Sequence, residues 1–219
     1  MTVVQKFYLH DASSTDGGTL PPGTSESATS PSVTAAGAST SRAMDGNKGS
    51  SQVGPTLGSG AVSGVRNCWF RRFVSAPVSA QVVASGTWQL RAAIKTSATA
   101  GGGAWQISAI VYSWRPSTGA LVTTIVDAVT TGIGTAAGTS ETDTTVATIT
   151  ASGSSVTFQN GDILVVEIWG TTSQTALSRT WTLYYDGTTE GSTTSNAAYL
   201  LAPTGILLPG GGGPLYMAA

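Results

Sequence analysis

The chain has 219 residues, only 10% of them charged, and a formal net charge of -1. This near-neutral balance argues against nucleic acid as a main partner, because phosphate binding requires a basic surface. No apolar run is long enough to cross a bilayer, so we expect no membrane partner. The single cysteine, Cys68, allows neither an internal disulfide nor a thiolate metal cluster, which indicates folding in a cytoplasm.

The N-terminal part divides into a short strand and a long polar stretch. Residues 1–10 are rich in β-forming side chains and are predicted to form a strand. Residues 11–65 consist largely of Ser, Thr and Gly, and such a segment cannot bury enough apolar surface to form its own core. It is either a disordered linker or an arm that becomes ordered on other subunits. We therefore treat residues 1–65 as an N-terminal strand followed by an extended arm.

From Cys68 onward the sequence has the pattern of short β-strands separated by Gly, Ser, Thr, Asn and Asp. The expected strands cover residues 68–74, 79–84, 87–95, 104–114, 120–126, 143–150, 154–159, 162–169, 180–186 and 197–208. No segment shows a helical period with caps. This spacing is typical of an all-β protein and predicts a jelly-roll-like antiparallel β-sandwich over residues 66–208.

Alternation along several of these segments predicts which side chains share a face. One predicted face, on the 87–95 strand, consists of Trp88, Leu90, Ala92 and Ile94. The 162–169 strand is predicted to place Ile163, Val165, Glu167 and Trp169 on one face and Leu164, Val166 and Ile168 on the other.

The C-terminal tail, residues 209–219, starts with Pro209 and four glycines. It then ends in a small apolar group that includes Leu215, Tyr216 and Met217. A flexible tether before an apolar end is typical of a hook that enters a groove on a partner. The alternative is a frayed terminus.

Two carboxylates, Asp162 and Glu167, lie within the most apolar run of the chain. Side-chain alternation places them on opposite faces of one strand, where they cannot act on the same bond. Asn160, Gly161 and Asp162 are predicted to form a turn, with a positive φ at Gly161 and Asp162 bonded to nearby backbone N–H groups. Glu167 then lies on a solvated or interface face, or pairs with an arginine such as Arg72 or Arg91.

The remaining candidates for chemistry are few, and we expect no catalytic residue and no cofactor. His10 is the single histidine, and its predicted role is a surface or interface hydrogen bond. Asp186 and Glu190 are the candidate ligands for a cation in a loop. A hydrolase would require two carboxylates about 5–10 Å apart, for which Asp186 paired with Glu190 or with Glu167 is the alternative to consider.

Two features suggest contact with other molecules. Arg66, Arg71 and Arg72 form a basic cluster, which either protects a strand edge or contacts an acidic neighbour. Trp114, followed by Arg115, is the best candidate for stacking on a sugar, although tryptophans within strands usually belong to the core. The candidate partner-binding residues are Phe7, Tyr8, Leu9, His10, Arg71, Arg72, Leu215 and Tyr216.

Several phrases of the sequence resemble structural proteins of tailed bacteriophage particles that have β-sandwich cores. The resemblance covers most of residues 1–12 and 68–208, but neither the Ser/Thr/Gly-rich stretch nor the glycine-rich tail. Its phrases describe a fold and contain no catalytic signature. They are FYLHDA (7–12), WFRRFVSAPVSAQVV (69–83), GTWQLRAAIKTS (86–97), NGDILVVEIW (160–169) and YYDGTTE (184–190).

The resemblance implies a virion component without enzymatic activity, assembled in the bacterial cytoplasm. We expect an auxiliary protein of the head, in contact with the major capsid protein or other virion proteins and with itself as a homotrimer. Its N-terminal strand and arm would clamp neighbouring subunits, so deletion of residues 1–60 is expected to leave a folded core. The alternative is a tail, collar or fibre component whose β-sandwich binds host glycans.

Overall fold

The structure is a computed structural model, and it describes residues 1–13, 42–54, 56–59, 64–96, 105–129, 144–172, 179–190, 192 and 194–209. Every helix or strand element within these ranges is a β-strand, so the chain is an all-β protein. In chain order the strands are β1 (Thr2–Ser13), β2 (Arg42–Asp45), β3 (Thr56–Ser59), β4 (Gly64–Ser75), β5 (Gln81–Val83), β6 (Gly86–Thr96), β7 (Trp105–Arg115), β8 (Ala120–Val129), β9 (Thr144–Gly153), β10 (Val156–Phe158), β11 (Ile163–Thr172), β12 (Arg179–Tyr184) and β13 (Tyr199–Leu208). A search of the described residues for a helix able to cross a membrane finds none.

Eleven strands belong to one sheet, in the order β3-β12-β6-β13-β1-β2-β4-β11-β7-β8, with β9 paired to β6. The other two, β10 and β5, pair with each other. Neighbours in the large sheet are antiparallel, except that β2 runs parallel to β4. The sheet is therefore mixed, which corrects the expectation of a purely antiparallel arrangement.

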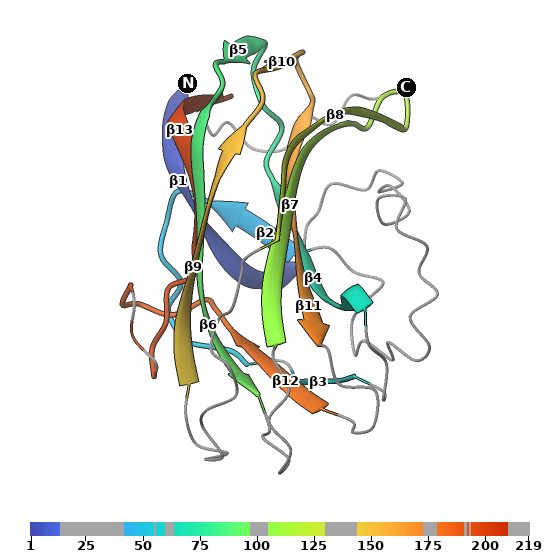
Figure 1. The fold of residues 1–219 in the computed structure, drawn as a ribbon. Helices are drawn as coiled ribbons and strands as arrows, with labels where there is room; N and C mark the ends of the chain where they lie inside the picture. Colours follow the sequence, from blue (N-terminus) through green and yellow to red (C-terminus); the bar gives the residue numbers. More distant parts are fainter. Residues whose placement is uncertain are drawn as a thin grey trace.

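The main core lies between two groups of strands within this sheet. In Figure 1, β1, β6, β9 and β13 lie on the left, β4, β7, β8 and β11 lie on the right, and β2 crosses between them. Buried side chains from both groups form one apolar cluster, for example Trp88 and Ile149 on one side and Val111, Val126 and Val166 on the other. Because the large sheet supplies both sides of this cluster, its apolar faces cover each other.

The face assignments made from the sequence are confirmed wherever side chains are described. Trp88, Leu90, Ala92 and Ile94 all belong to the main core. On β11, Leu164, Val166 and Ile168 face the same core, whereas Ile163, Val165 and Trp169 belong to a second apolar cluster on the opposite face. Strict alternation places β11 between two buried layers, which explains its continuous apolar sequence.

Each strand expected from the sequence is present, with ends that differ by a few residues. Two strands were not expected, β2 and β3, and both lie within the stretch predicted to be an arm. Each has only four residues and lacks a clear apolar alternation. Their strand conformation is set by their neighbours, because β2 pairs with both β1 and β4, and β3 pairs with β12.

The N-terminal strand is an interior strand of the chain's own sheet. β1 pairs with β13 along one side and with β2 along the other. Phe7 and Leu9, two of the candidate partner-binding residues, are fully buried in the main core. This position is at odds with the expectation that residues 1–60 can be removed without loss of the fold, because their removal would take away an interior strand and part of the core.

Candidate functional site

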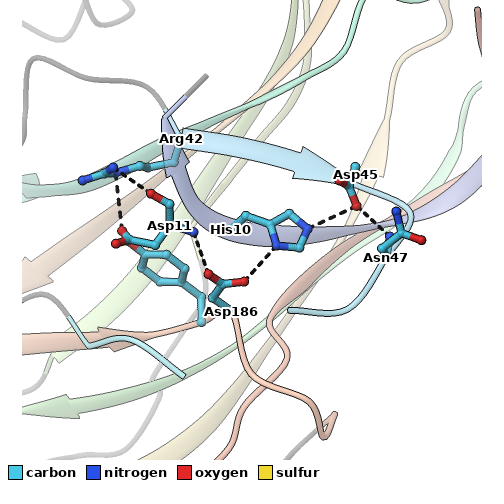
Figure 2. Close-up of polar contacts among 7 residues, drawn as sticks. His10, Asp11, Arg42, Asp45, Asn47 and Asp186 are labelled. Atoms are coloured by element: carbon cyan, nitrogen blue, oxygen red, sulfur yellow. Dashed lines mark hydrogen bonds and ion pairs between the residues drawn. The ribbon is translucent and has the colours of Figure 1, made fainter. Parts of the chain in front are cut away.

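Charged and polar side chains gather where the end of β1 meets β2 and the loop after β12 (Figure 2). We call the group formed by His10, Asp11, Arg42, Asp45, Asn47 and Asp186 the His10 cluster. Its members come from three segments that are distant in the sequence, and β-sheet pairing brings two of them together: Tyr8 on β1 lies opposite Asp45 on β2.

His10 lies between two carboxylates. Its Nδ1 atom is 2.9 Å from Oδ1 of Asp186, and its Nε2 atom is 3.2 Å from Oδ1 of Asp45. The imidazole side chain is 13% exposed. Asp45 also accepts a hydrogen bond from the backbone N–H of Asn47 at 2.7 Å, and Asp186 accepts one from the backbone N–H of Asp11 at 3.0 Å. Both carboxylates are therefore fixed in position by the backbone.

This arrangement favours a protonated imidazole. The hydrogen bond to Asp45 is the main cause that raises the pKa of His10 from its ordinary value of 6.5 to about 9, with Asp186 acting in the same direction against the effect of burial. The hydrogen bond from His10 in turn lowers the pKa of Asp45. With both ring nitrogens bonded to carboxylates and the ring charged at neutral pH, His10 lacks the free nitrogen that a general base requires.

We expect the cluster to stabilise the fold in a defined pH range. Because the pKa of folded His10 lies above its unfolded value, its contribution is fully present below pH 6.5 and is lost as the pH rises through about 9. Because water screens this partly exposed site, we expect the charged His10 to add about 1–3 kcal/mol to the free energy of unfolding. The chain has a single histidine, so an NMR titration of its ring signals reports this group alone.

The titration midpoint is expected near pH 9, and Asp45→Asn should lower it by about one unit or more, because the main partner loses its charge. Gln5→Asn, a substitution on β1 outside the His10 cluster, serves as the control and should leave the midpoint unchanged. A midpoint close to 6.5 in the unmodified protein would show that the imidazole does not lie between the two carboxylates in solution.

The rest of the His10 cluster connects β1, β2 and the segment after β12. Nη1 of Arg42 donates to the backbone carbonyl of Asp11 at 2.7 Å, and its Nε lies 3.5 Å from the Asp11 carboxylate. The hydroxyl of Tyr185 donates to the same carboxylate at 2.8 Å. Burial raises the pKa of Tyr185, so its hydroxyl remains a donor. The cluster thus ties three distant segments together.

A second polar group lies next to the first, on the same face of β1. Both Glu190 carboxylate oxygens lie 3.0 Å from Nζ of Lys6, and one accepts a 2.6 Å hydrogen bond from the Tyr8 hydroxyl. Lys48 is 3.8 Å from the same carboxylate, and Nζ of Lys6 lies 4.6 Å from the ring centre of Tyr199. Burial alone would raise the pKa of Glu190, but the bonds from Tyr8 and Lys6 outweigh it and lower the pKa.

The two candidate cation ligands therefore have separate partners. Asp186 bonds to His10 and Glu190 bonds to Lys6 and Tyr8. Within the described ranges, no group of three or more His, Cys, Asp or Glu side chains is arranged to hold a metal ion. Glu167, the other carboxylate considered for a hydrolase, lies elsewhere, on β11, with partners of its own.

An open groove of about 570 Å³ runs beside the first half of β1. We call it the β1 slot. Its walls are Thr2, Val3, Val4, Gln5, Lys6, Tyr8, Asp45, Gly46, Asn47, Ala76, Leu208 and Pro209. The slot begins where β2 ends. Gly46 passes close to Val4, and a Cβ atom at this glycine would lie 3.2 Å from the valine side chain.

Glu167 has a structural partner set in the interior. Nη2 of Arg72 lies 2.6 Å and its Nε 2.8 Å from Oε1 of Glu167, which also accepts a 2.9 Å hydrogen bond from the Tyr112 hydroxyl. Nε1 of Trp169 donates to Oε2 at 3.2 Å. The sequence analysis offered two alternatives for Glu167, and the structure confirms the one in which it pairs with Arg72. The other alternative, a solvated face, is wrong because Glu167 is 0% exposed.

Asp162 has the predicted turn role together with an unpredicted partner. Gly161 has a φ of 89°, and the Asp162 carboxylate accepts the backbone N–H of Gln159 at 2.7 Å. In addition, Arg115 donates to both carboxylate oxygens, at 2.8 and 2.9 Å. This bidentate pair joins the turn before β11 to the end of β7.

The other sequence candidates lie in buried positions or outside the described residues. Arg71 and Arg72 are buried, so neither lies on an exposed basic patch. Trp114 is also buried, in the second apolar cluster, and does not offer a ring face for a sugar. The tail candidates Leu215 and Tyr216, and the side chain of Cys68, lie outside the described residues.

Sequence reasoning did not find Arg42, Asp45 or the β1 slot. The two side chains lie in a polar stretch without a strand pattern, and their partners on β1 and after β12 are far away in the sequence. The local signal that is present is Asp45-Gly46-Asn47, a sequence typical of a turn. This motif indicates that the chain turns here, but it does not tell which strand lies next to the turn.

Comparisons with known proteins identify no family. No protein-family model and no curated protein matches the sequence. Among solved structures, one similar chain is a CocE/NonD family hydrolase from Staphylococcus aureus, with 10% identity and a TM-score of 0.48 over 74% of this chain and 34% of that chain. Another is an aminopeptidase from the marine sediment archaeon Thaumarchaeota archaeon, with 10% identity and a TM-score of 0.42 over 75% and 35% of the two chains.

An α-amino acid ester hydrolase is also similar, with 12% identity and a TM-score of 0.34. The similar solved chains are described as hydrolases, so the expectation that this chain has no enzymatic activity is not kept. The present chain spans about one third of the length of the first two. At such identities the likeness assigns no catalytic residue or substrate to this chain, and it leaves the chain without an assigned family.

Proposed function

We propose that this chain is a structural protein of a tailed-bacteriophage particle, an auxiliary protein of the head that contacts the major capsid protein or other virion proteins. In this proposal it forms a homotrimer within the virion. We further propose that the two strand groups around the main core form a β-sandwich of the jelly-roll type. The buried cluster shared by β6, β9 and β13 with β7, β8 and β11 supports this arrangement.

The observation that carries the proposal is that most acidic side chains of the described residues pair with basic side chains of the same chain. The chain contains 11 acidic residues, and six of them form ion pairs or charged hydrogen bonds within the fold. They are Asp11, Asp45, Asp162, Glu167, Asp186 and Glu190. Soluble monomers usually keep such charges on the surface for solubility. Asp162 and Glu167 are buried, and the other four carboxylates are partly exposed but each has a basic partner, so these charges offer little opposition to packing against neighbours.

Quantitative mass spectrometry of purified particles from the bacteriophage that encodes this chain tests the proposal. Hundreds of copies per particle are expected for a protein that coats the head. A few copies, on the order of three to twelve, would place the chain in a tail, collar or fibre instead. Absence from particles, together with presence in the soluble fraction of the lysate, would refute a structural role.

A further inference from the structure

A polar face of the large sheet lies on the side of β6 that is turned away from the main core. On β6, Leu90 and Ile94 enter the core, so Gln89 and Arg91 lie on the opposite face. Strand register extends this face across β9, β6, β13 and β1 as two rows of side chains. We call the two rows the Arg91 face. They consist of Thr150, Gln89, Leu201 and Lys6 in the first row and of Thr148, Arg91, Tyr199 and Tyr8 in the second.

Arg91 lies within this face and is only partly buried. Its Nε atom is buried and has no hydrogen-bond partner. Within the described part of the chain Arg91 also forms no ion pair, whereas Arg72 and Arg115 pair with Glu167 and Asp162. A buried donor without a partner is uncommon in folded proteins and calls for a partner outside the fold. Because a guanidinium can bind both oxygens of one carboxylate, Arg91 is placed to receive a carboxylate.

The charges around Arg91 favour an anionic partner. Lys6 and Lys48 share one acidic partner, Glu190, at 3.0 and 3.8 Å. Lys95 lies on the same face of β6, two alternate positions beyond Arg91. Four basic side chains are thus accompanied by one carboxylate. The His10 cluster borders this face at Tyr8 and leaves the balance positive, because each carboxylate of that cluster has a basic partner within it.

The two aromatic side chains of the face favour a peptide over a sugar chain. Stacking on a sugar requires an exposed ring face, but Tyr8 and Tyr199 are only 8% and 5% exposed. Nζ of Lys6 lies 4.6 Å from the ring centre of Tyr199, and Nζ of Lys48 lies 5.9 Å from that of Tyr8. In an extended peptide, side chains on one face repeat about every 6.8 Å, which is also the repeat along each strand of the Arg91 face.

We propose that the Arg91 face binds an acidic segment of another protein. One carboxylate of the segment pairs with Arg91, and others lie near Lys6, Lys48 and Lys95. Because the lysines are partly exposed, the contact depends on salt and contributes specificity more than affinity. The inference goes beyond the proposed function. It concerns the purified chain, so the number of copies in a virus particle does not bear on it.

The first test is an NMR titration of the ¹⁵N-labelled chain with a peptide of eight Glu-Thr repeats. Saturable shifts are expected for amides of β1, β6, β9 and β13, and the dissociation constant should rise severalfold when salt is increased from about 0.05 to 0.3 M. A peptide of eight Gln-Thr repeats serves as the control and should cause no saturable shift, since it has no carboxylate side chains.

The second test compares variants of equal net charge. Arg91→Gln removes the guanidinium and should raise the dissociation constant of the Glu-Thr peptide by about fivefold or more. Thr124→Glu, at an exposed position on β8 outside the Arg91 face, also lowers the net charge by one and should change it by less than about twofold. Lys48→Gln, at a side chain that is 46% exposed, provides an independent variant and should weaken binding by about twofold or more.

Three results would overturn the proposal. One is the absence of saturable shifts with the Glu-Thr peptide. Another is an equal loss of affinity in Arg91→Gln and Thr124→Glu, which would show that the attraction comes from the net charge of the whole chain. The third is tighter binding of polygalacturonate, an acidic polysaccharide, than of the Glu-Thr peptide at equal carboxylate concentration, which would assign the face to a glycan.

Discussion

Deletion of residues 1–13 is expected to abolish cooperative folding of this chain. The deletion removes β1, which lies between β13 and β2, and exposes the ladder groups of both neighbours. It also removes Phe7 and Leu9, each 0% exposed in the main core. Burial of each of these side chains contributes about 1.5–3 kcal/mol, and typical domains have only about 5–15 kcal/mol of total stability. The deletion variant should show no sigmoidal unfolding transition in urea by circular dichroism.

Point substitutions make this prediction quantitative. Phe7→Ala should lower the free energy of unfolding by about 3–5 kcal/mol, because it leaves a cavity in the core. Val3→Ala, on the same strand but largely exposed, should change it by less than about 0.5 kcal/mol. If the chain without residues 1–13 unfolds as sharply as the intact chain, β1 is a peripheral strand in solution, and the sheet order described above is incorrect.

The buried ion pair between Glu167 and Arg72 gives the second large effect. Glu167→Gln keeps the shape of the side chain but removes the charge of the carboxylate that Arg72, a residue only 8% exposed, pairs with in the interior. Removal of one member of a buried pair typically costs about 3–5 kcal/mol. We expect a loss of this size in the free energy of unfolding, measured by urea denaturation with tryptophan fluorescence.

A double variant separates the cost of breaking the Arg72–Glu167 ion pair from the cost of altered packing. In Arg72→Met with Glu167→Leu, both charges are replaced by apolar side chains of related volume, so most of the lost stability should return. The pair lies beside the apolar cluster that contains Trp169, which can accept such side chains. If Glu167→Gln alone costs less than about 1 kcal/mol, water reaches the pair in solution.

These expectations differ from those of a detachable arm. In the sequence, residues 11–65 resemble a linker because they contain few large apolar residues among many Ser, Thr and Gly. In the structure, Met44 from this stretch is buried in the core, and Asp45 fixes the single histidine. A polar segment can therefore be integral to a sheet when its few apolar side chains meet a core that other strands have already formed.

The sequence by itself determined eleven of the thirteen described strands, all except β2 and β3, and the faces of those with regular alternation. On β6 and β11 every second side chain enters the same layer, because strand geometry repeats every two residues, and this rule needs no knowledge of the rest of the chain. The turn at Gly161 was predictable for a similar reason, since the need for a positive φ is local.

The tertiary structure alone decided which strands are neighbours, and with them both candidate sites. His10 contacts Asp45, 35 residues away, and Asp186, 176 residues away. The β1 slot lies beside the N-terminal half of β1, where β2 has already ended. Strand order depends on which apolar faces and backbone edges are satisfied together across the whole sheet. No short stretch of sequence contains that information, because the hydrogen bonds of a strand are completed by residues elsewhere in the chain.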